Sequence, residues 1–226
     1  MKIQVWSDFR CPFCYIGKTH LDRALKELNI DAELEFMSYE LDRDMPQTSD
    51  VGAIEGLAQK YGISIQEARD RMDSVVRMAK DTDLHYDFDN LIDVNSFNAH
   101  RVLHIAKQKG LGNEFGKAVM SAHLEHGKNI NDAETLIALG KSVGLSKEDV
   151  THALEADEVA MYVRQEQQLA QMVGVKGVPF FLIDGKLSLS GAQPVEVMKQ
   201  ALNYAQEMQA APSFDGPVCE DGSCDI

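Results

Sequence analysis

The sequence is poor in cationic residues and contains no long apolar run, and each shortage excludes a class of partner. Lys and Arg together number 22 against 36 Asp and Glu, which gives a formal net charge of −14. This charge repels phosphate backbones and anionic membrane surfaces, so we expect no nucleic-acid partner. No stretch approaches the roughly 20 apolar residues that a membrane-spanning helix requires, so we also expect no membrane insertion.

The N-terminal segment lacks the features of an export signal. Residues 1–8 interrupt their apolar side chains with Lys, Gln, Ser and Asp, and they contain no continuous apolar core. We therefore expect a cytoplasmic protein. In a reducing compartment, paired cysteines are more often catalytic, redox-sensing or metal-binding than structural.

Cysteine is also scarce, and its distribution is informative. The four cysteines form two close pairs, Cys11 with Cys14 and Cys219 with Cys224. The first pair lies in the sequence Cys-Pro-Phe-Cys, and two thiols at this spacing are the minimal unit for two-electron thiol–disulfide exchange. Cys11 and Cys14 are therefore the candidate catalytic residues.

The pattern of apolar residues predicts sheet-forming pieces at both ends of the chain. Alternation predicts strands near 3–5 and 30–36, and the helix between them implies that these two strands are parallel. A hairpin over 179–189 and a last helix that begins at Pro194 complete this part. The segment between them shows a series of amphipathic helices separated by glycines.

We therefore predict an α/β protein with a discontinuous sheet domain. The sheet domain comprises 1–48 and 173–210, and 49–172 form an all-helical insertion. Residues 211–226 are predicted to be a flexible acidic tail that carries the second cysteine pair.

The proline of the Cys-Pro-Phe-Cys motif fixes the roles of its neighbours. Proline favours the first helical position, which makes Cys11 the helix cap and Pro12 the first helical residue. The Cys11 sulfur is then expected to face free main-chain amides, which with the helix dipole favour its thiolate. Cys11 is the predicted nucleophile, and the more shielded Cys14 is the resolving thiol. Phe13 supplies no imidazole to stabilise the Cys11 anion, so we expect moderate acidity.

Two features near this motif have alternative interpretations. The alternative for the cysteine pair is one half of a zinc site, for which Cys219 and Cys224 would have to supply the other ligands. The proline favours a redox role instead. Asp8 and Arg10 flank Cys11 with opposite charges, and they are either tuning groups or solvated surface residues.

Two separated segments support a resemblance to a known family. The sequence SDFRCPFCYIG at 7–17 closely resembles the active-site stretch of DsbA-like thioredoxin-fold oxidoreductases, in particular the FrnE branch. Residues 174–181 resemble the loop that precedes the third strand in that family. The resemblance implies a thioredoxin-like fold with a large all-helical insertion. It also implies a protein disulfide oxidoreductase or isomerase that needs no cofactor.

The resemblance further implies roles for residues far from the cysteines. Pro179 is expected to be a cis-proline packed against the cysteine motif, and the alternative is a trans proline that starts a strand. The Val178 backbone is expected to offer strand-like hydrogen bonds to a substrate peptide. Residues 98–101 match a helical motif of the family. His100 and His104 lie on one helical face, and we favour partly buried polar residues over metal ligands, so no metal site is predicted.

The second cysteine pair is predicted to be an accessory redox pair. Gly222 allows the turn that a local disulfide between Cys219 and Cys224 needs, and a flexible tail could carry the pair to Cys11 and Cys14. A disulfide that only clips the tail and metal chelation are the alternatives.

Two other functions stay open. Related branches include 2-hydroxychromene-2-carboxylate isomerases and kappa-type glutathione transferases, which usually have Ser where this chain has Cys11. A redox-sensing or zinc-holding module is the non-enzymatic alternative. For the favoured function, the expected partners are protein thiols and disulfides and a recycling thiol system, glutathione or thioredoxin-like. The chain could also form a homodimer.

Overall fold

The computed structural model describes residues 1–47 and 49–210, and its centre is a mixed sheet. Among these residues the strand order is β2-β1-β3-β4. β1 (Lys2–Ser7) pairs in parallel with β2 (Glu33–Ser38) and antiparallel with β3 (Phe180–Ile183). β3 pairs antiparallel with β4 (Leu187–Ser190). Strands from the two ends of the chain therefore form one sheet, with β1 inside it.

Two helices pack against the sheet. α1 (Pro12–Leu28) connects the parallel strands, and it ends at Asn29, whose left-handed conformation is one that asparagine tolerates. α9 (Val195–Ala210) packs beside α1. A buried apolar cluster joins both helices to the sheet, and it includes Ile3, Val5, Leu21, Phe181, Met198 and Leu202. The predicted parallel pair, hairpin and last helix are confirmed.

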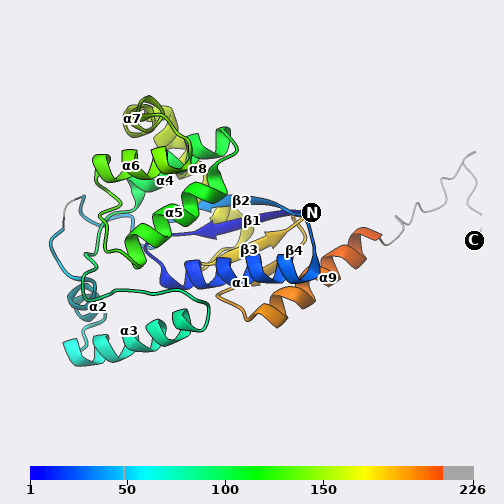
Figure 1. Ribbon diagram of the computed structural model, residues 1–226, viewed down its shortest axis with the longest axis horizontal. Coiled ribbons are helices and arrows are strands. Elements are labelled where there is room, and N and C mark those ends of the chain that lie inside the picture. Colours follow the sequence, from blue (N-terminus) through cyan, green and yellow to red (C-terminus); the bar gives the residue numbers. More distant parts are fainter. Residues whose placement is uncertain (48, 211–226) are drawn as a thin grey trace, which may run out of the picture.

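The remaining helices all lie between β2 and β3 in the sequence (Figure 1). They are α2 (Ala53–Tyr61), α3 (Ile65–Lys80), α4 (Phe97–Gln108), α5 (Gly112–Leu124), α6 (Ala133–Val143), α7 (Lys147–Glu155) and α8 (Asp157–Val173). Ser64 caps α3, and Ser146 forms a capping box with Asp149 in α7. No helix in the described ranges is long and apolar enough to cross a membrane.

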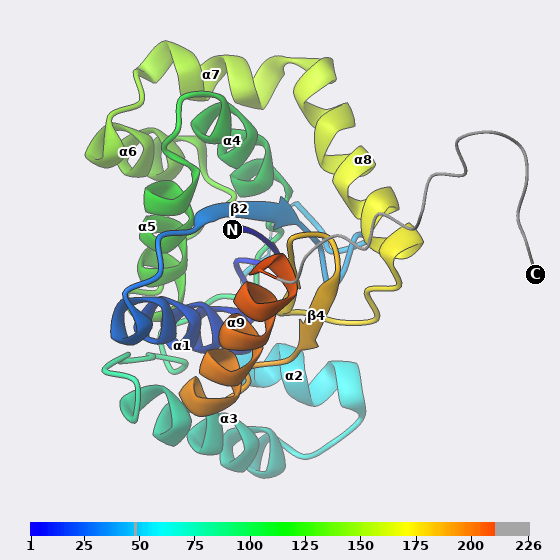
Figure 2. The same cartoon turned by 90° about the vertical axis from the view of Figure 1, so that its right-hand side faces the viewer.

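The helical insertion covers the sheet on the β2 side. α4, α5 and α8 contact β2, whereas α3 contacts α1 (Figures 1 and 2). The largest apolar cluster runs from the start of α1 into the insertion, and it contains Phe9, Cys14, Ile16, Phe36, Phe115 and Met120 among others. The cysteine motif is therefore packed on side chains from both parts of the chain.

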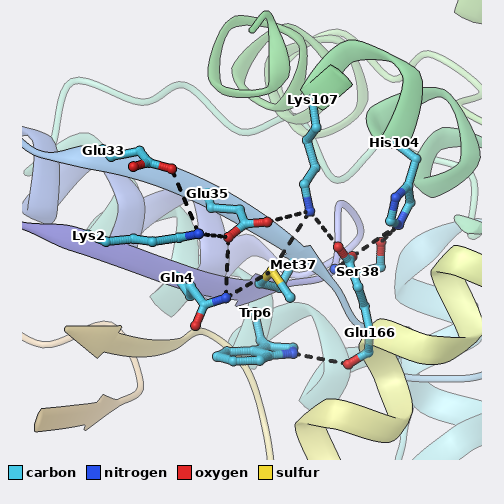
Figure 3. Close-up of polar contacts among 10 residues, drawn as sticks. All are labelled: Lys2, Gln4, Trp6, Glu33, Glu35, Met37, Ser38, His104, Lys107 and Glu166. Carbon is cyan, nitrogen blue, oxygen red and sulfur yellow. Dashed lines mark hydrogen bonds and ion pairs between the residues drawn. The ribbon is translucent and has the colours of Figure 1, made fainter. Parts of the chain in front are cut away.

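A partly buried polar cluster joins the insertion to the sheet (Figure 3). The Glu166 carboxylate of α8 accepts a hydrogen bond of 2.6 Å from the Ser38 amide of β2 and lies 3.1 Å from His104 Nε2 of α4. Lys107 also pairs with this carboxylate, and the Trp6 indole donates to the Glu166 carbonyl at 3.2 Å. Burial opposes ionisation of Glu166, but His104 and Lys107 outweigh it and lower its pKa to about 2.

Candidate active site

The two thiols of the cysteine motif lie at the first turn of α1. Cys11 is the helix cap with extended backbone, and Pro12 is the first helical residue. Both cysteines are free thiols, with exposed fractions of 5% for Cys11 and 1% for Cys14, whereas Phe13 between them is 39% exposed. No acidic residue lies in the first turn of α1, so no carboxylate there opposes the helix dipole at Cys11.

The Cys11 sulfur faces a different group from the one that the sequence predicted. It makes no capping hydrogen bond with the amides of α1. The sulfur lies 3.8 Å from the main-chain oxygen of Val178, to which the thiol donates. A protonated thiol is a donor, so it turns to a carbonyl and not to N–H groups. The expectation of sulfur–amide contacts was therefore wrong for the protonated state.

Cys14 lies in an environment that keeps its proton. Burial raises the pKa of the Cys14 thiol well above its usual value, and the neighbouring Cys11 sulfur raises it further. The Ser7 hydroxyl and the Asp8 backbone act in the opposite direction with smaller effect. When one sulfur of the pair carries a negative charge, loss of the proton from the other sulfur is therefore strongly unfavourable.

The loop before β3 lies next to the cysteine motif, because the start of β3 pairs with the end of β1. The Val178–Pro179 peptide bond is cis, and Cys11 and Val178 are 167 positions apart in the sequence. Pro179 also lies against Gly17 of α1, where an added Cβ would come 2.9 Å from the Pro179 Cγ. Val178, Pro179, Cys11 and Cys14 are thus brought together at one end of the sheet.

An open groove runs beside this loop. It has a volume of about 310 Å³, and it is lined by Gly174, Lys176, Gly177, Val178, Ser190 and Gly191. Within the described part of the chain, the Val178 N–H makes no hydrogen bond. The groove therefore presents a free main-chain donor at the rim of the cysteine site.

Asp8 is a buried ion and not a solvated surface charge. Its carboxylate is fully buried and accepts hydrogen bonds from the Leu41 amide at 2.8 Å and the Arg10 amide at 3.1 Å. Burial opposes its ionisation, but His100, 3.8 Å away, and Arg10 outweigh it and lower the Asp8 pKa to about 2. The Asp8 carbonyl in turn accepts from the Cys11 amide at 3.0 Å. Asp8 therefore fixes the backbone that leads into the site.

His100 and His104 engage different carboxylates. His100 lies beside Asp8 and packs against the Phe9 ring with centroids 4.6 Å apart, whereas His104 pairs with Glu166. In the described ranges, no group of three or more His, Cys, Asp or Glu side chains is arranged to hold a metal ion. His100 thus links α4 to the sheet domain, whereas His104 links α4 to α8 within the insertion.

The sequence interpretation missed Tyr86, which comes from the segment between α3 and α4. Its hydroxyl donates a 2.7 Å hydrogen bond to the Pro12 carbonyl, and its ring stacks on Tyr15 with centroids 6.3 Å apart. Burial raises the Tyr86 pKa above its usual value, and the nearby Cys11 adds to this effect. The available signal was the alternation of apolar and acidic or polar residues through Leu84, Tyr86 and Phe88.

Comparison with known proteins agrees with this architecture. A model described as a DSBA-like thioredoxin domain matches residues 2–203. The chain therefore belongs to the DsbA-like thioredoxin family. It is 29% identical over 217 residues to the uncharacterized protein YwbO of Bacillus subtilis (strain 168). The matched region covers 91% of this chain and 97% of YwbO.

Solved structures with this fold include a near and two distant relatives. The probable DsbA oxidoreductase SCO1869 from Streptomyces coelicolor has a TM-score of 0.88 and 30% identity over 100% of this chain and 99% of that one. A 2-hydroxychromene-2-carboxylate isomerase has a TM-score of 0.70 and 16% identity, covering 93% and 98%. The cytosolic disulfide reductase DsbM from Pseudomonas aeruginosa with GSH has a TM-score of 0.65 and 18% identity, covering 93% and 98%. The last two are similar in fold alone.

Proposed function

We propose that the protein is a thiol–disulfide oxidoreductase or isomerase that acts on protein disulfides in the cytoplasm through Cys11 and Cys14. The observation that carries this proposal is the 3.8 Å approach of the Cys11 sulfur to the Val178 carbonyl at the cis-proline loop. A free thiol at the start of a helix thus borders a groove in which the Val178 N–H makes no hydrogen bond with the described residues. This combination suits attack on a disulfide in an extended polypeptide.

The first step forms a mixed disulfide. The Cys11 thiolate attacks one sulfur of the substrate disulfide, forms a bond to it and releases the other substrate sulfur as a thiolate. Burial and the adjacent Cys11 sulfur raise the Cys14 pKa, so Cys14 is the thiol of the pair that keeps its proton at this stage. Cys11 is therefore the attacking residue, and Cys14 waits as a thiol.

The second step resolves the mixed disulfide. Cys14 loses its proton, attacks the Cys11 sulfur and releases the second substrate thiolate. The dithiol loses two electrons and becomes a disulfide, the substrate disulfide gains them, and the two thiol protons pass through solvent to the substrate thiolates. The reverse sequence oxidises a substrate dithiol. Isomerisation begins with the same attack and ends when another substrate thiol displaces Cys11.

The substrate segment lies along the cis-proline loop. The Val178 N–H and C=O are the groups that an extended peptide would pair with, and the exposed Phe13 ring offers apolar contact next to Cys11. Pro12 and Pro179 keep the two sides of the site rigid.

A second thiol couple returns the site to its starting state. Glutathione is the first candidate, because a GSH-bound disulfide reductase shares this fold, and a thioredoxin-like protein is the other. Cys219 and Cys224 lie outside the described residues. Their role as an accessory pair that exchanges electrons with Cys11 and Cys14 is part of the proposal, and it rests on the sequence alone.

Turnover of protein disulfides tests the proposal. The reduced protein is expected to accelerate cleavage of insulin disulfides, and reactivation of scrambled ribonuclease would support the isomerase activity. If neither reaction is accelerated, the proposal is wrong. Glutathione-dependent isomerisation that persists in Cys14→Ser would instead favour an activity like that of the 2-hydroxychromene-2-carboxylate isomerases.

A redox titration tests the accessory pair. The protein is equilibrated in glutathione buffers, free thiols are alkylated, and mass spectrometry resolves the Cys11–Cys14 pair from the Cys219–Cys224 pair. The relay predicts that replacing Cys219 and Cys224 with Ser changes the equilibration of the first pair. Unchanged turnover and equilibration would contradict the relay while leaving the function of Cys11 and Cys14 intact.

A further inference from the structure

Gly177 is a glycine that the described fold does not require. Its φ does not lie in the left-handed region, so this angle does not require glycine. A Cβ built on Gly177 would have no described atom within 4 Å. By contrast, Gly174 and Gly191 in the same groove have φ values of 87° and 80°, which favour glycine. Neither its φ nor packing among the described residues therefore explains Gly177.

Gly177 lies where a side chain would affect access to the cysteine site. Gly177 lines the groove beside the cis-proline loop, and it directly precedes Val178. The Val178 carbonyl is 3.8 Å from the Cys11 sulfur, and the Val178 N–H is unused within the described residues. The open space above Gly177 is thus next to the groups that would hold a substrate main chain.

Paired extended chains lie close together. Neighbouring strands are about 4.8 Å apart, and residues opposite each other have Cα atoms about 4.5–5.5 Å apart. Any side chain in the open space at Gly177 would compete with a segment paired to Val178, and the competition would grow with the length of that side chain. A small disulfide that reaches Cys11 end-on needs none of this space.

We infer that Gly177 determines specificity by keeping the groove clear for the main chain of a polypeptide substrate. The inference rests on the proposed function, and it narrows the preferred substrate to disulfides in extended polypeptide segments. The exchange chemistry at Cys11 and Cys14 is the same for polypeptide and small disulfides. Only access along the groove distinguishes them.

The test compares two substrates in Gly177→Leu, Gly177→Ala and a matched control. Ser188→Leu adds the same side chain to an exposed position of β4 that does not line the groove. For each reduced protein, stopped-flow measurements give the rate constants for reaction with insulin and with bis(2-hydroxyethyl) disulfide. Thermal unfolding of each variant is measured alongside, and Gly177→Ala decides the result if Gly177→Leu does not fold.

The expected result is a selective loss. Gly177→Leu should slow reaction with insulin about tenfold or more while it changes reaction with the small disulfide less than about twofold. Gly177→Ala should show a smaller loss in the same direction, and Ser188→Leu should match the wild type. Equal slowing of both substrates, or no slowing of insulin, would overturn the inference. A wild type that reacts with neither substrate would instead contradict the proposed function.

Discussion

The Tyr86 hydroxyl donates a 2.7 Å hydrogen bond to the main-chain oxygen of Pro12. Tyr86 belongs to the insertion, and Pro12 lies between the two cysteines, so this bond is a direct link between the helical insertion and the redox motif. The aromatic ring extends the link, because it stacks on Tyr15 in the next turn of α1. The insertion therefore supports the cysteine site as well as covering the sheet.

Replacing Tyr86 with Phe should weaken this link without removing the ring. We expect a loss of about 1 kcal/mol in the free energy of unfolding, the usual net contribution of such a hydrogen bond. Urea unfolding of Tyr86→Phe measures it. Tyr15→Phe is the control, because the hydrogen bond from the Tyr15 hydroxyl to Glu125 is longer, at 3.4 Å, and should contribute less. Equal stabilities of wild type and Tyr86→Phe would show that the bond contributes nothing.

Replacing Asp8 with Asn should affect both stability and the site. The change removes a fully buried charge that faces His100 and Arg10, so we expect a loss of about 3 kcal/mol or more in the free energy of unfolding. Because the Asp8 carbonyl bonds to the Cys11 amide, the rate of Cys11 alkylation should change as well. His100→Gln should show the same two effects in weaker form. An Asp8→Asn protein with wild-type stability and alkylation would refute this account of the entry loop.

Stability should fall in acid because Glu166 has a depressed pKa. Its pKa moves from 4.5 in the unfolded chain to about 2 in the folded protein, so the contribution is fully present above about pH 4.5 and is lost as the pH falls toward 2. The difference corresponds to about 3 kcal/mol. Urea unfolding at a series of pH values measures it. Glu166→Gln should be less stable at pH 7 and should show a shallower loss in that window; parallel curves would count against the assignment.

Replacing Gly17 with Ala should push the two sides of the site apart. An added Cβ would lie 2.9 Å from the Pro179 Cγ, 3.2 Å from the Phe181 ring and 3.3 Å from the Ala192 Cα. Overpacking of this kind costs about 1–3 kcal/mol, and here it should also slow the reaction of Cys11 with disulfides. Thermal unfolding and insulin reduction measure the two effects. A Gly17→Ala protein that is as active and stable as the wild type would mean that the loop relaxes freely.

The sequence predicted the regular elements well because their signals are local. Alternation in 30–36 and proline at the start of α1 depend on neighbouring residues, so β2 and the position of Cys11 followed directly. Contacts between segments that are distant in the sequence were harder to predict. Tyr86 lies in an irregular segment without helical periodicity, and the Asp8–His100 contact depends on how α4 packs against the entry loop. Burial of Asp8 could not be predicted, because a lone charge near a loop is usually solvated.

Trapping of the mixed disulfide tests the central claim most directly. Reduced Cys14→Ser and Cys11→Ser proteins are mixed with oxidised insulin, quenched in acid and analysed by mass spectrometry. If Cys11 attacks and Cys14 resolves, Cys14→Ser accumulates a covalent adduct at Cys11, and Cys11→Ser forms none on the same timescale. An adduct at Cys14 that forms equally fast in Cys11→Ser, or the absence of any adduct in both variants, would contradict the account.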